Sequence, residues 1–443
     1  MKQLSGNFQR KTFSSVLVKF AVCFLVLGLA YRLFSSSLLQ FSPVFVGNDE
    51  KPGLSAGKTM PPQVVAEPPP EITDDPFLNL DDHAPENVTE KCNLFLGDWV
   101  PEPNGPMYTN TTCQTIEAPQ NCMKNGRPDS DYIYWRWKPR DCNLPKFDPN
   151  KFLNIMRKKS MAFIGDSIMR NHVQSLLCML SKVEKAVDVY HDEPYRNRRW
   201  SFPSYKFTVS LFWSPFLTKA HTFEDDNGVS TGLIQLHLDE LDTLWTKQIE
   251  NLDYVIIAGG KWFLKSALYY ENNTLVGCHN CHNANITQLG FQYAYRKAIN
   301  SVLKFIIGSK KKALFRTLVP DHFENGEWNT GGYCNRTRPF KEGEIEINDT
   351  DEIMRRVELE EFQCAAAEIG SANTMSLELF DATLLSLLRP DGHPGVYRQF
   401  HPNARIDKHA NAKIQNDCLH WCLPGPIDSW NDLMLEMLLK DKN

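Results

Sequence analysis

The chain has 443 residues, of which 42% are hydrophobic, and it carries a formal net charge of −5. This length fits one large domain or two smaller ones. The negative charge argues against a general nucleic-acid-binding protein, which is normally basic, so we expect no nucleic-acid partner. Aromatic residues make up 11% of the chain, and we assign most of them to the hydrophobic core rather than to a carbohydrate site.

The N-terminal segment has the features of a membrane anchor. An apolar stretch over residues 16–34 follows three basic residues and is interrupted by Lys19. It fits either a cleaved signal peptide or a short membrane span in which Lys19 extends towards the cytosolic surface. Bulky residues stand where a cleavage site needs small ones, which favours the uncleaved signal anchor. The flanking positive charge then predicts a cytoplasmic tail over residues 1–15 and a lumenal body, and a short span suits the thinner membranes early in the secretory route.

Two features beyond this segment agree with a lumenal body. Eleven of the twelve cysteines follow it, and most of them should be paired in an oxidising compartment. Because eleven is odd, at least one thiol is free or intermolecular, and we choose Cys178, which lies on the apolar face of an expected helix. Sequons for N-glycosylation also follow the segment. They stand at Asn87, Asn110, Asn272, Asn285, Asn335 and Asn348.

Composition divides the body into three parts. Residues 35–90 are rich in Pro and acidic side chains and should form an extended stem. Residues 91–150 are loop-rich and predict a smaller N-terminal lobe stapled by disulfides. Residues 151–443 alternate between strand-like and helix-like runs. The cysteines of the lobe are Cys92, Cys113, Cys122 and Cys142.

The alternation after residue 151 predicts an α/β fold, with a mainly parallel sheet flanked by helices. In such sheets the ligand site lies beyond the carboxyl ends of the strands. The expected strands are Met161–Ile164, Phe207–Phe212, Leu233–Leu238, Tyr254–Ala258, Ala313–Thr317 and Met375–Phe380. The expected helices are Ile168–Leu180, Thr287–Ile307, Ile353–Ala367 and Asp428–Leu439.

A corner of Gly165, Asp166 and Ser167 joins the first of these strands to the first helix. One interpretation is structural, because Gly turns the chain and Asp or Ser caps the helix. The other is catalytic, because the corner exposes a serine hydroxyl for attack on an acyl group. A helix N-terminus can also stabilise a developing oxyanion. A serine nucleophile needs a base, since its hydroxyl is inert at neutral pH.

Two Asp-x-x-His arrangements offer such a base. Asp188 and His191 lie in a charged stretch that is typical of a surface loop. Asp417 and His420 lie in a segment whose two cysteines should hold the backbone rigid, as a catalytic pair requires. There the aspartate would orient the imidazole and stabilise its charged form. We therefore choose Asp417 and His420, with a surface pair beside a disulfide as the alternative.

Two further clusters are assigned structural roles. Asp391 and His393 stand in a tight turn, and a structural or substrate-contact role fits them better than proton transfer. Cys278 and Cys281, each followed by a histidine, resemble a metal cluster, but no second ligand pair stands at a suitable spacing. In an oxidising lumen we expect disulfides there and no metal site.

Four separated motifs carry a family resemblance. They read "FIGDSIMRNHVQSLLC", "RTLVPDHFENGEWNTGGYCNRTRPF", "RPDGHPGVYR" and "NDCLHWCLPGPIDSWNDLML". Together they resemble the plant trichome birefringence-like proteins, and "KCNLFLGDWV" and "YIYWRWKPRDCNLPKFD" resemble the N-terminal motif region of that family. The resemblance covers residues 92–440. Within it, "FPSYKFTVSLFWSPFL" and "YYENNTLVGCHNC" look closest to the branch acting on xyloglucan and mannan.

This resemblance implies a single-pass type II Golgi membrane protein that O-acetylates cell-wall polysaccharides. It implies an SGNH-hydrolase-like catalytic domain, here residues 151–443. It places the Gly-Asp-Ser motif of the family at Ser167 and the two residues before it, and the Asp-x-x-His motif at Asp417 and His420. One departure is Lys261, which stands where members often have the histidine of a Gly-His-Trp motif.

These residues predict acyl transfer by double displacement. Ser167, deprotonated by His420, would take an acetyl group that a sugar hydroxyl then removes. The backbone N–H of Ser167, with Gly260 and the side chains of Arg170 or Asn171, would hold the oxyanion. No nucleotide-binding signature is present in the sequence. We therefore expect no bound cofactor and an acetyl donor that is acetyl-CoA or another carrier.

Two alternatives to a transferase remain. An acetylesterase with the same triad would differ only in admitting water to the acyl-enzyme. A non-catalytic binder of wall polysaccharide would need neither the serine nor the histidine. The expected partners of a transferase are a hemicellulose acceptor (xyloglucan or mannan favoured over xylan) and the Golgi membrane, with glycosyltransferases or acetyl-donor transport proteins as further candidates.

Overall fold

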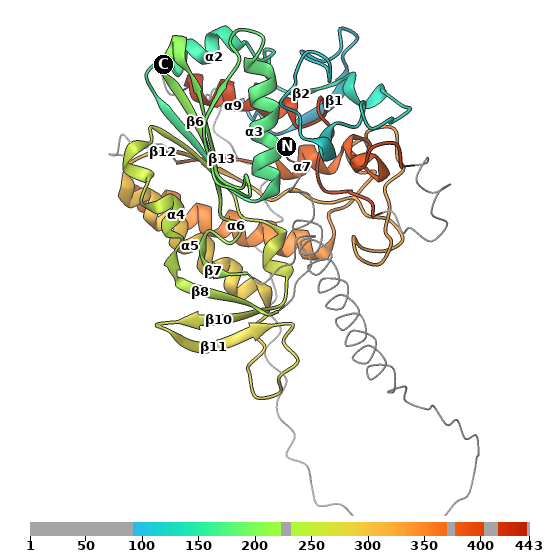
Figure 1. Ribbon diagram of the computed structural model, residues 1–443. Coiled ribbons are helices and arrows are strands. Elements are labelled where there is room, and N and C mark those ends of the chain that lie inside the picture. Colours follow the sequence, from blue (N-terminus) through green and yellow to red (C-terminus); the bar gives the residue numbers. More distant parts are fainter. Residues whose placement is uncertain (1–91, 223–231, 370–376, 403–414, 441–443) are drawn as a thin grey trace, which may run out of the picture. The chain divides into compact units, whose positions relative to one another are not determined.

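The computed structural model describes residues 92–222, 232–369, 377–402 and 415–440, which belong to one compact unit (Figure 1). The predicted tail, anchor and stem, residues 1–15, 16–34 and 35–90, lie outside the described residues, as does the sequon at Asn87. Within the described part, no helix is both long and apolar enough to cross a membrane.

The main sheet has seven strands in the order β13-β12-β9-β3-β6-β5-β4. The five strands from β13 to β6 run parallel to their neighbours, whereas β5 and β4 pair antiparallel. β3 lies between β9 and β6, so residues that follow these three strands meet at one edge of the sheet. The strands are β3 (Ser160–Gly165), β4 (Val187–His191), β5 (Arg198–Phe202), β6 (Phe207–Trp213), β9 (Tyr254–Ile257), β12 (Lys312–Arg316) and β13 (Leu377–Phe380).

Alternating side chains of β3 build two separate cores, one on each face of the sheet. Met161 and Phe163 face the core formed with helices α3 and α9, whereas Ala162 and Ile164 face the core formed with α5 and α6. The predicted parallel sheet with helices on both faces is therefore confirmed. The helices are α2 (Pro149–Ile155), α3 (Ser167–Leu180), α4 (Thr243–Thr246), α5 (Gly290–Ser309), α6 (Asp349–Ile369), α7 (Thr383–Leu387) and α9 (Asp428–Lys440).

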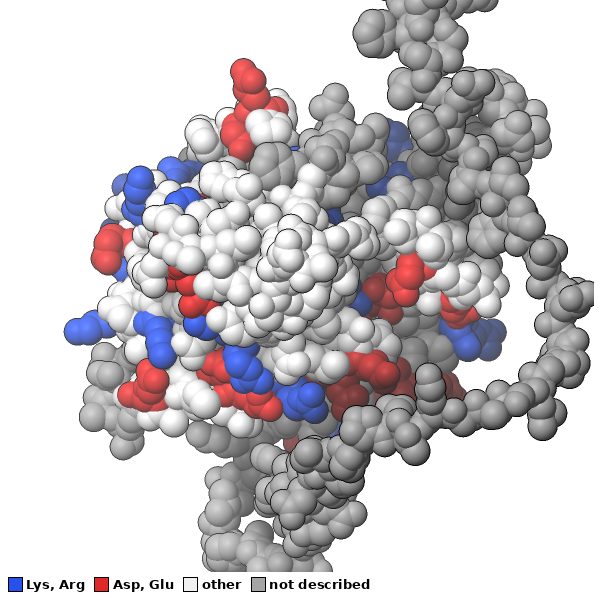
Figure 2. All heavy atoms as spheres, turned by 90° about the horizontal axis from the view of Figure 1, so that it is seen from below, with Lys and Arg blue, Asp and Glu red and all other residues white. Residues whose placement is uncertain are grey.

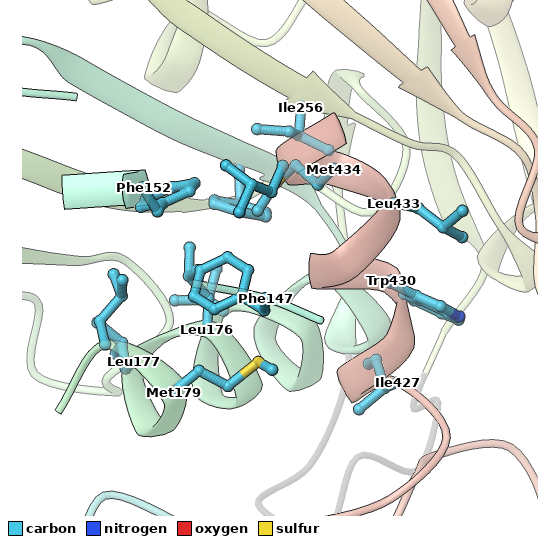
Figure 3. Close-up of a cluster of buried hydrophobic side chains, with 14 of the residues drawn as sticks. Phe147, Phe152, Leu176, Leu177, Met179, Ile256, Ile427, Trp430, Leu433 and Met434 are labelled. Atoms are coloured by element: carbon cyan, nitrogen blue, oxygen red, sulfur yellow. The ribbon is translucent and has the colours of Figure 1, made fainter. Parts of the chain in front are cut away.

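Figure 3 shows the core between α3 and α9. Leu176 of α3 and Trp430, Leu433 and Met434 of α9 are each at most 1% exposed. Burying such side chains stabilises the fold by about 1.5–3 kcal/mol each. This packing holds α9, and the segment that precedes it, close to the helix that begins at Ser167.

A second sheet, ordered β11-β10-β8-β7, lies below the main sheet in Figure 1. The expected strand Leu233–Leu238 is part of it, as β8, and packs against α5 rather than joining the main sheet. Its hydrogen-bonding neighbours are β7 and β10. The sequence therefore predicts that this strand is buried, but not which sheet it joins. The strands are β7 (Thr218–His221), β8 (Ile234–Leu241), β10 (Ala267–Glu271) and β11 (Thr274–His279).

The region predicted as the N-terminal lobe contains the antiparallel pair β1 (Gly97–Pro101) and β2 (Trp135–Pro139). Trp99 and Trp137 pack edge to face, with ring centroids 5.7 Å apart, and belong to the same hydrophobic core as α3 and α9. A disulfide joins Cys92, at the start of this region, to Cys142, near its end. Residues 92–150 thus bury their apolar side chains against the main sheet's helices.

The disulfides correct one prediction. Cys178 is not a free thiol but is bonded to Cys113, which ties α3 to the N-terminal region. The free cysteine among the described residues is Cys364, exposed on α6. Burial on an apolar helix face is equally typical of a thiol and of a half-cystine, so the sequence pattern could not separate the two. The expectation that Cys278 and Cys281 form disulfides is confirmed, and the structure shows that they are bonded to each other.

On the face drawn in Figure 2, acidic and basic side chains lie intermixed around a broad uncharged area. This face therefore presents no extended basic surface of the kind that binds nucleic acid. The observation agrees with the net charge of −5.

Candidate active site

The corner after β3 presents Ser167 at the start of α3. Asp166 caps this helix, since its Oδ1 accepts a hydrogen bond from Ile168 N at 3.0 Å. Gly165 has φ 154°, and a Cβ there would lie 2.7 Å from Ala258 O and 2.8 Å from Met169 Cγ. The glycine thus permits the close turn and the aspartate supplies the cap. The half-buried serine is left at a helix N-terminus, where backbone N–H groups face a developing negative charge.

The proposed base is held by the neighbouring aspartate. His420 Nδ1 lies 2.9 Å from Asp417 Oδ2 and 3.0 Å from Oδ1, and His420 N also donates to Oδ1 at 3.0 Å. A carboxylate accepts only, so it fixes the proton of the neutral imidazole on Nδ1 and leaves Nε2 free to take a proton. This is the arrangement of base and orienting acid that a serine nucleophile requires.

Burial and mutual charge act on both groups of this pair. Burial alone would lower the pKa of His420, but the Asp417 carboxylate outweighs it and raises that pKa above its ordinary value. Burial would raise the pKa of Asp417, but His420 outweighs it and lowers the pKa well below its ordinary value. The pair is thus stabilised in its charged form, which a general base passes through during proton transfer.

One side chain of α3 links the predicted nucleophile to the segment of the predicted base. Asn171 lies four residues after Ser167, on the same face of the helix. Its Oδ1 accepts from Trp421 N at 2.7 Å, and its Nδ2 donates to Trp421 O at 3.3 Å. Trp421 is the neighbour of His420 in the chain. These contacts favour a positioning role for Asn171 over the predicted oxyanion role.

Two disulfides fix the segment on either side of the base. Cys418 is bonded to Cys334, and Cys422 is bonded to Cys122. The prediction that both cysteines are oxidised is confirmed. Each bond ties the segment to a different part of the fold, so the backbone around His420 is covalently anchored on both sides.

The strands on either side of β3 complete the surroundings of the serine. Gly260, after β9, lies against the helix cap, since a Cβ there would be 2.5 Å from Asp166 Oδ2. Trp213 ends β6 and pairs with Gly165 in the strand register. The predicted oxyanion residue Arg170 places its guanidinium 4.8 Å over the Trp213 ring. Both Gly260 and Arg170 therefore lie close to the Gly-Asp-Ser corner.

The lysine that departs from the family pattern has two acidic partners. Lys261 Nζ lies 2.6 Å from Asp321 Oδ2, which follows β12, and 2.6 Å from Asp351 Oδ1 on α6. Asp351 is fully buried. The lysine therefore joins the loop after β9 to the start of α6, a structural role that no spacing in the sequence indicated.

The two rejected pairs occupy different environments. Asp188 and His191 lie on β4, an exposed edge strand, with His191 Nδ1 3.5 Å from Asp188 Oδ1. Our assignment of this stretch to a loop is wrong, although its exposure is as predicted. Asp391 is fully buried in an ion pair with Arg389, and His393 Nδ1 lies 2.7 Å from His420 O. The structural role predicted for Asp391 and His393 is therefore supported.

A cavity of about 840 Å³ includes Lys261 and His322 in its wall, whereas Ser167, Asp417 and His420 are not among its lining residues. Its size falls within the range of small-molecule sites. Acidic and aromatic side chains form part of the lining. They are Asp321, Glu324, Glu327, Glu346, Asp349, Phe291, Phe323 and Phe340.

The sequons within the described part differ in accessibility. Asn110 is half-buried, whereas the other four are exposed, as glycosylation requires. The exposed ones are Asn272, Asn285, Asn335 and Asn348.

Comparison with known proteins gives two family matches. Residues 144–437 match the GDSL/SGNH-like acyl-esterase family found in Pmr5 and Cas1p, and residues 90–143 match the PMR5 N-terminal domain. Protein trichome birefringence-like 25 of Arabidopsis thaliana is 52% identical, over 96% of this chain and 93% of the relative. The chain belongs to the trichome birefringence-like family. The predicted family and the SGNH-like α/β fold are thereby confirmed.

Members of this family with a named activity are also similar to the chain. Xyloglucan O-acetyltransferase 1 of Arabidopsis thaliana is 44% identical, over 79% of this chain and 81% of the relative. Xyloglucan O-acetyltransferase 2 of Populus trichocarpa is 45% identical, over 79% of this chain and 82% of the relative.

Proposed function

We propose that this protein is an O-acetyltransferase that acetylates hydroxyls of plant cell-wall hemicellulose through an acetyl-serine intermediate. Ser167 is the nucleophile, His420 the base and Asp417 the residue that orients the base. The observation that carries this proposal is the bond between Asn171 and Trp421, because it joins the helix of the serine to the residue beside the histidine. The Asp417–His420 hydrogen bonds support the assignment of the base.

The proposed reaction has two balanced steps. Ser167 Oγ attacks the acetyl carbonyl of the donor while His420 Nε2 takes the hydroxyl proton, and that proton then leaves with the donor's departing group. In the second step a sugar hydroxyl attacks the acetyl-serine while His420 takes its proton. The sugar ester forms, and the proton returns to Ser167 Oγ.

Charge on the carbonyl oxygen develops in both steps. The N–H of Ser167 at the start of α3 is one donor to it, with Gly260 and Arg170 as further groups at the same corner. The donor itself is acetyl-CoA or another acetyl carrier, and the proposal requires no bound cofactor.

The large cavity supports a polysaccharide acceptor. Its carboxylates can accept hydrogen bonds from sugar hydroxyls, and its aromatic rings can pack against sugar faces. Xyloglucan is the favoured acceptor because of the two relatives named for that activity. Mannan is the second choice and xylan the third.

We further propose a Golgi location for this activity, with residues 16–34 as a type II signal anchor and the catalytic part in the lumen. The disulfides and the exposed sequons support a secretory compartment. Glycosyltransferases and acetyl-donor transport proteins are the partners that such a location would offer.

A second candidate is a polysaccharide acetylesterase with the same triad, which the esterase name of the matching family favours. The full-length chain, given an acetyl donor and hemicellulose oligosaccharides, should yield acetylated sugar rather than free acetate. Ser167→Ala and His420→Ala should each abolish transfer, and the double variant should be no worse, since nucleophile and base act as a unit. His191→Ala, on the exposed edge strand, is the matched control and should be fully active.

The assay also separates the remaining alternatives. Release of acetate without sugar ester would establish the esterase. Oligosaccharide binding that survives Ser167→Ala, with no turnover by the unaltered chain on either test, would establish the non-catalytic binder.

A further inference from the structure

Two buried histidines form a chain of hydrogen bonds that ends at the base. His322 Nε2 lies 2.8 Å from Leu387 O, His322 Nδ1 lies 2.7 Å from His393 Nε2, and His393 Nδ1 lies 2.7 Å from His420 O. The two rings are only 7% and 3% exposed. Neither histidine takes part in the two steps of the proposed reaction.

The three hydrogen bonds determine how many protons the two imidazole rings must carry. A carbonyl oxygen can only accept, so His322 Nε2 and His393 Nδ1 must each carry a proton. The bond between the two rings needs a third proton, on one or the other of the facing nitrogens. Two neutral imidazoles carry two protons in total, so all three bonds form only when the pair holds one extra proton and one positive charge.

We propose that His322 and His393 share one extra proton and, as a buried imidazole–imidazolium pair, position the catalytic base. The pair does not touch the reacting atoms, so both histidines are positioning residues. They act on the carbonyl of His420 through His393 Nδ1, and the backbone N–H of His322 separately donates to Cys418 O at 2.9 Å. This inference rests on the proposed role of His420.

Ion pairs flank the two histidines. On the side of His322, Asp321 is paired with Lys261. On the side of His393, Asp391 is paired with Arg389.

The remaining charges near His393 belong to the base segment and the N-terminal region. Arg127 is paired with Asp129 and also donates from Nη1 to His393 O at 2.9 Å. Asp417 faces His420, and Arg398 also acts on it. His420 must be neutral to act as a base, so it does not then balance the negative charge of Asp417. The proposed positive charge on His322 and His393 helps to balance it instead.

Two further effects act on the extra proton. Burial lowers the pKa of both imidazoles, and the charges of Lys261 near His322 and of Arg127 near His393 act in the same direction. Acting against this, loss of the proton would leave two lone pairs facing each other at 2.7 Å or break a bond to a buried carbonyl. The Trp421 ring, stacked on His393 with centroids 4.3 Å apart, also favours the charged form. The pair therefore binds its extra proton more tightly than either buried ring would alone.

The functional consequence is a pH dependence separate from that of the base. When the pair loses its proton, one of the three bonds must break and the His420 carbonyl is held less firmly. Activity should then fall on the alkaline side as the pair deprotonates, whereas deprotonation of His420 raises activity on the acidic side.

A glutamine provides the sharpest variant. The amide NH2 of His322→Gln has two N–H donors, so it can donate both to Leu387 O and to the lone pair of His393 Nε2 without an extra proton. We expect this variant to lose the alkaline limb of the pH profile and to retain more activity than His322→Leu. His322→Leu should lower kcat by about 10- to 100-fold with little change in KM. His191→Gln, at an exposed histidine, should change neither.

The protonation state can be measured without turnover. In the full-length chain labelled with ¹⁵N-histidine, NMR at pH 6 should find three ring protons on these two histidines, with assignment by comparison with His322→Gln. Two neutral rings, one proton each, would overturn the proposal whatever the enzyme does. An alkaline limb that persists unchanged in an active His322→Gln variant would overturn the positioning role. Failure of acetyl transfer itself would instead refute the proposed function.

Discussion

Asn171 and Trp421 are joined by two hydrogen bonds, from Trp421 N to Asn171 Oδ1 at 2.7 Å and from Asn171 Nδ2 to Trp421 O at 3.3 Å. The two residues are 250 positions apart in the chain. Because Asn171 follows Ser167 by one helical turn, any shift of this helix also moves the segment that carries His420. Ser167 and His420, the proposed nucleophile and base, are therefore positioned as one unit.

Replacing Asn171 by alanine should separate that unit. We expect kcat to fall by about 10- to 100-fold with little change in KM, because a small misplacement of the base affects the chemical step most. The unpaired backbone groups of Trp421 should also cost about 1–3 kcal/mol of stability. Asn154→Ala, at an exposed position on α2, is the control. A folded Asn171→Ala variant with unaltered kcat would show that the contact does not position the base.

Alanine substitutions at two glycines, one at the candidate site and one away from it, can be compared directly. A Cβ on Gly260 would lie 2.5 Å from Asp166 Oδ2, whereas a Cβ on Gly308 of α5 would meet nothing within 4 Å. Gly260→Ala should displace the helix cap, lowering kcat by about tenfold or more and stability by about 0.5–2 kcal/mol. Gly308→Ala should leave kcat unchanged and increase the stability of the folded protein by up to about 1 kcal/mol. Equal kcat values for the two variants would argue that the Gly260 contact is unimportant.

The pH profile should report the Asp417–His420 pair. Because the pKa of His420 is raised and the base must be neutral, kcat should rise as the pH increases through that raised value. Asp417→Asn removes the charge that raises it, so the acidic limb should move to lower pH. Its loss of activity should be smaller than that of His420→Ala, because the proton acceptor remains. If the acidic limb of the Asp417→Asn profile stays at the same pH, that limb reports the titration of a group other than His420.

The same pair should make stability depend on pH in two windows. His420 has a raised pKa in the folded state, so its stabilising effect is complete below the ordinary histidine value of about 6.5 and is lost as the pH rises through the folded pKa. Asp417 has a lowered pKa, so its effect is present above about 3.9 and is lost as the pH falls. Urea unfolding of the full-length chain and of Asp417→Asn across this range should show their difference in stability largest between these values. A difference independent of pH would contradict the coupling.

Removal of the disulfides beside the base should affect two properties separately. Replacing both Cys122 and Cys422 by serine should cost about 2–5 kcal/mol of stability and also lower kcat, because the segment of His420 loses an anchor. Replacing Cys92 and Cys142, in the N-terminal region, should cost stability without lowering kcat below the unfolding temperature. Equal kcat for both double variants would show that the anchor is not needed for catalysis.

Peptide mapping of the unreduced protein tests the pairing directly. Cys364 should react with an alkylating reagent in the native state, whereas Cys178 should react only after reduction. Free thiols at both Cys418 and Cys422 in protein made through the secretory route would contradict the anchored base and the lumenal assignment.

Buried strands and the corner at Ser167 were predictable because each is a local pattern. An apolar run followed by Gly-Asp-Ser and an amphipathic helix specifies its own geometry within about twenty residues. The preference for Asp417 and His420 over Asp188 and His191 as the candidate pair also rests on a local pattern, because the cysteines beside His420 indicate a rigid segment.

Relations between distant segments were not predictable in this way. The sheet that β8 joins, the partner of Cys178 and the ion pairs of Lys261 each depend on residues brought together only by the complete fold. For the same reason Asn171 was assigned to the oxyanion, since the sequence shows its place on the helix and not the backbone that it meets. His322 follows an expected strand, but nothing local indicates its bond to His393.

The most direct test of the proposed mechanism is detection of the acetyl-enzyme. The full-length chain is mixed with an isotopically labelled acetyl donor, quenched with acid and analysed by intact mass and peptide mapping. We predict one labelled acetyl group on Ser167, which disappears when xyloglucan oligosaccharide is added while labelled sugar ester is formed. Labelled sugar ester formed by the Ser167→Ala variant, or a transferable acetyl group on any other residue, would contradict the account.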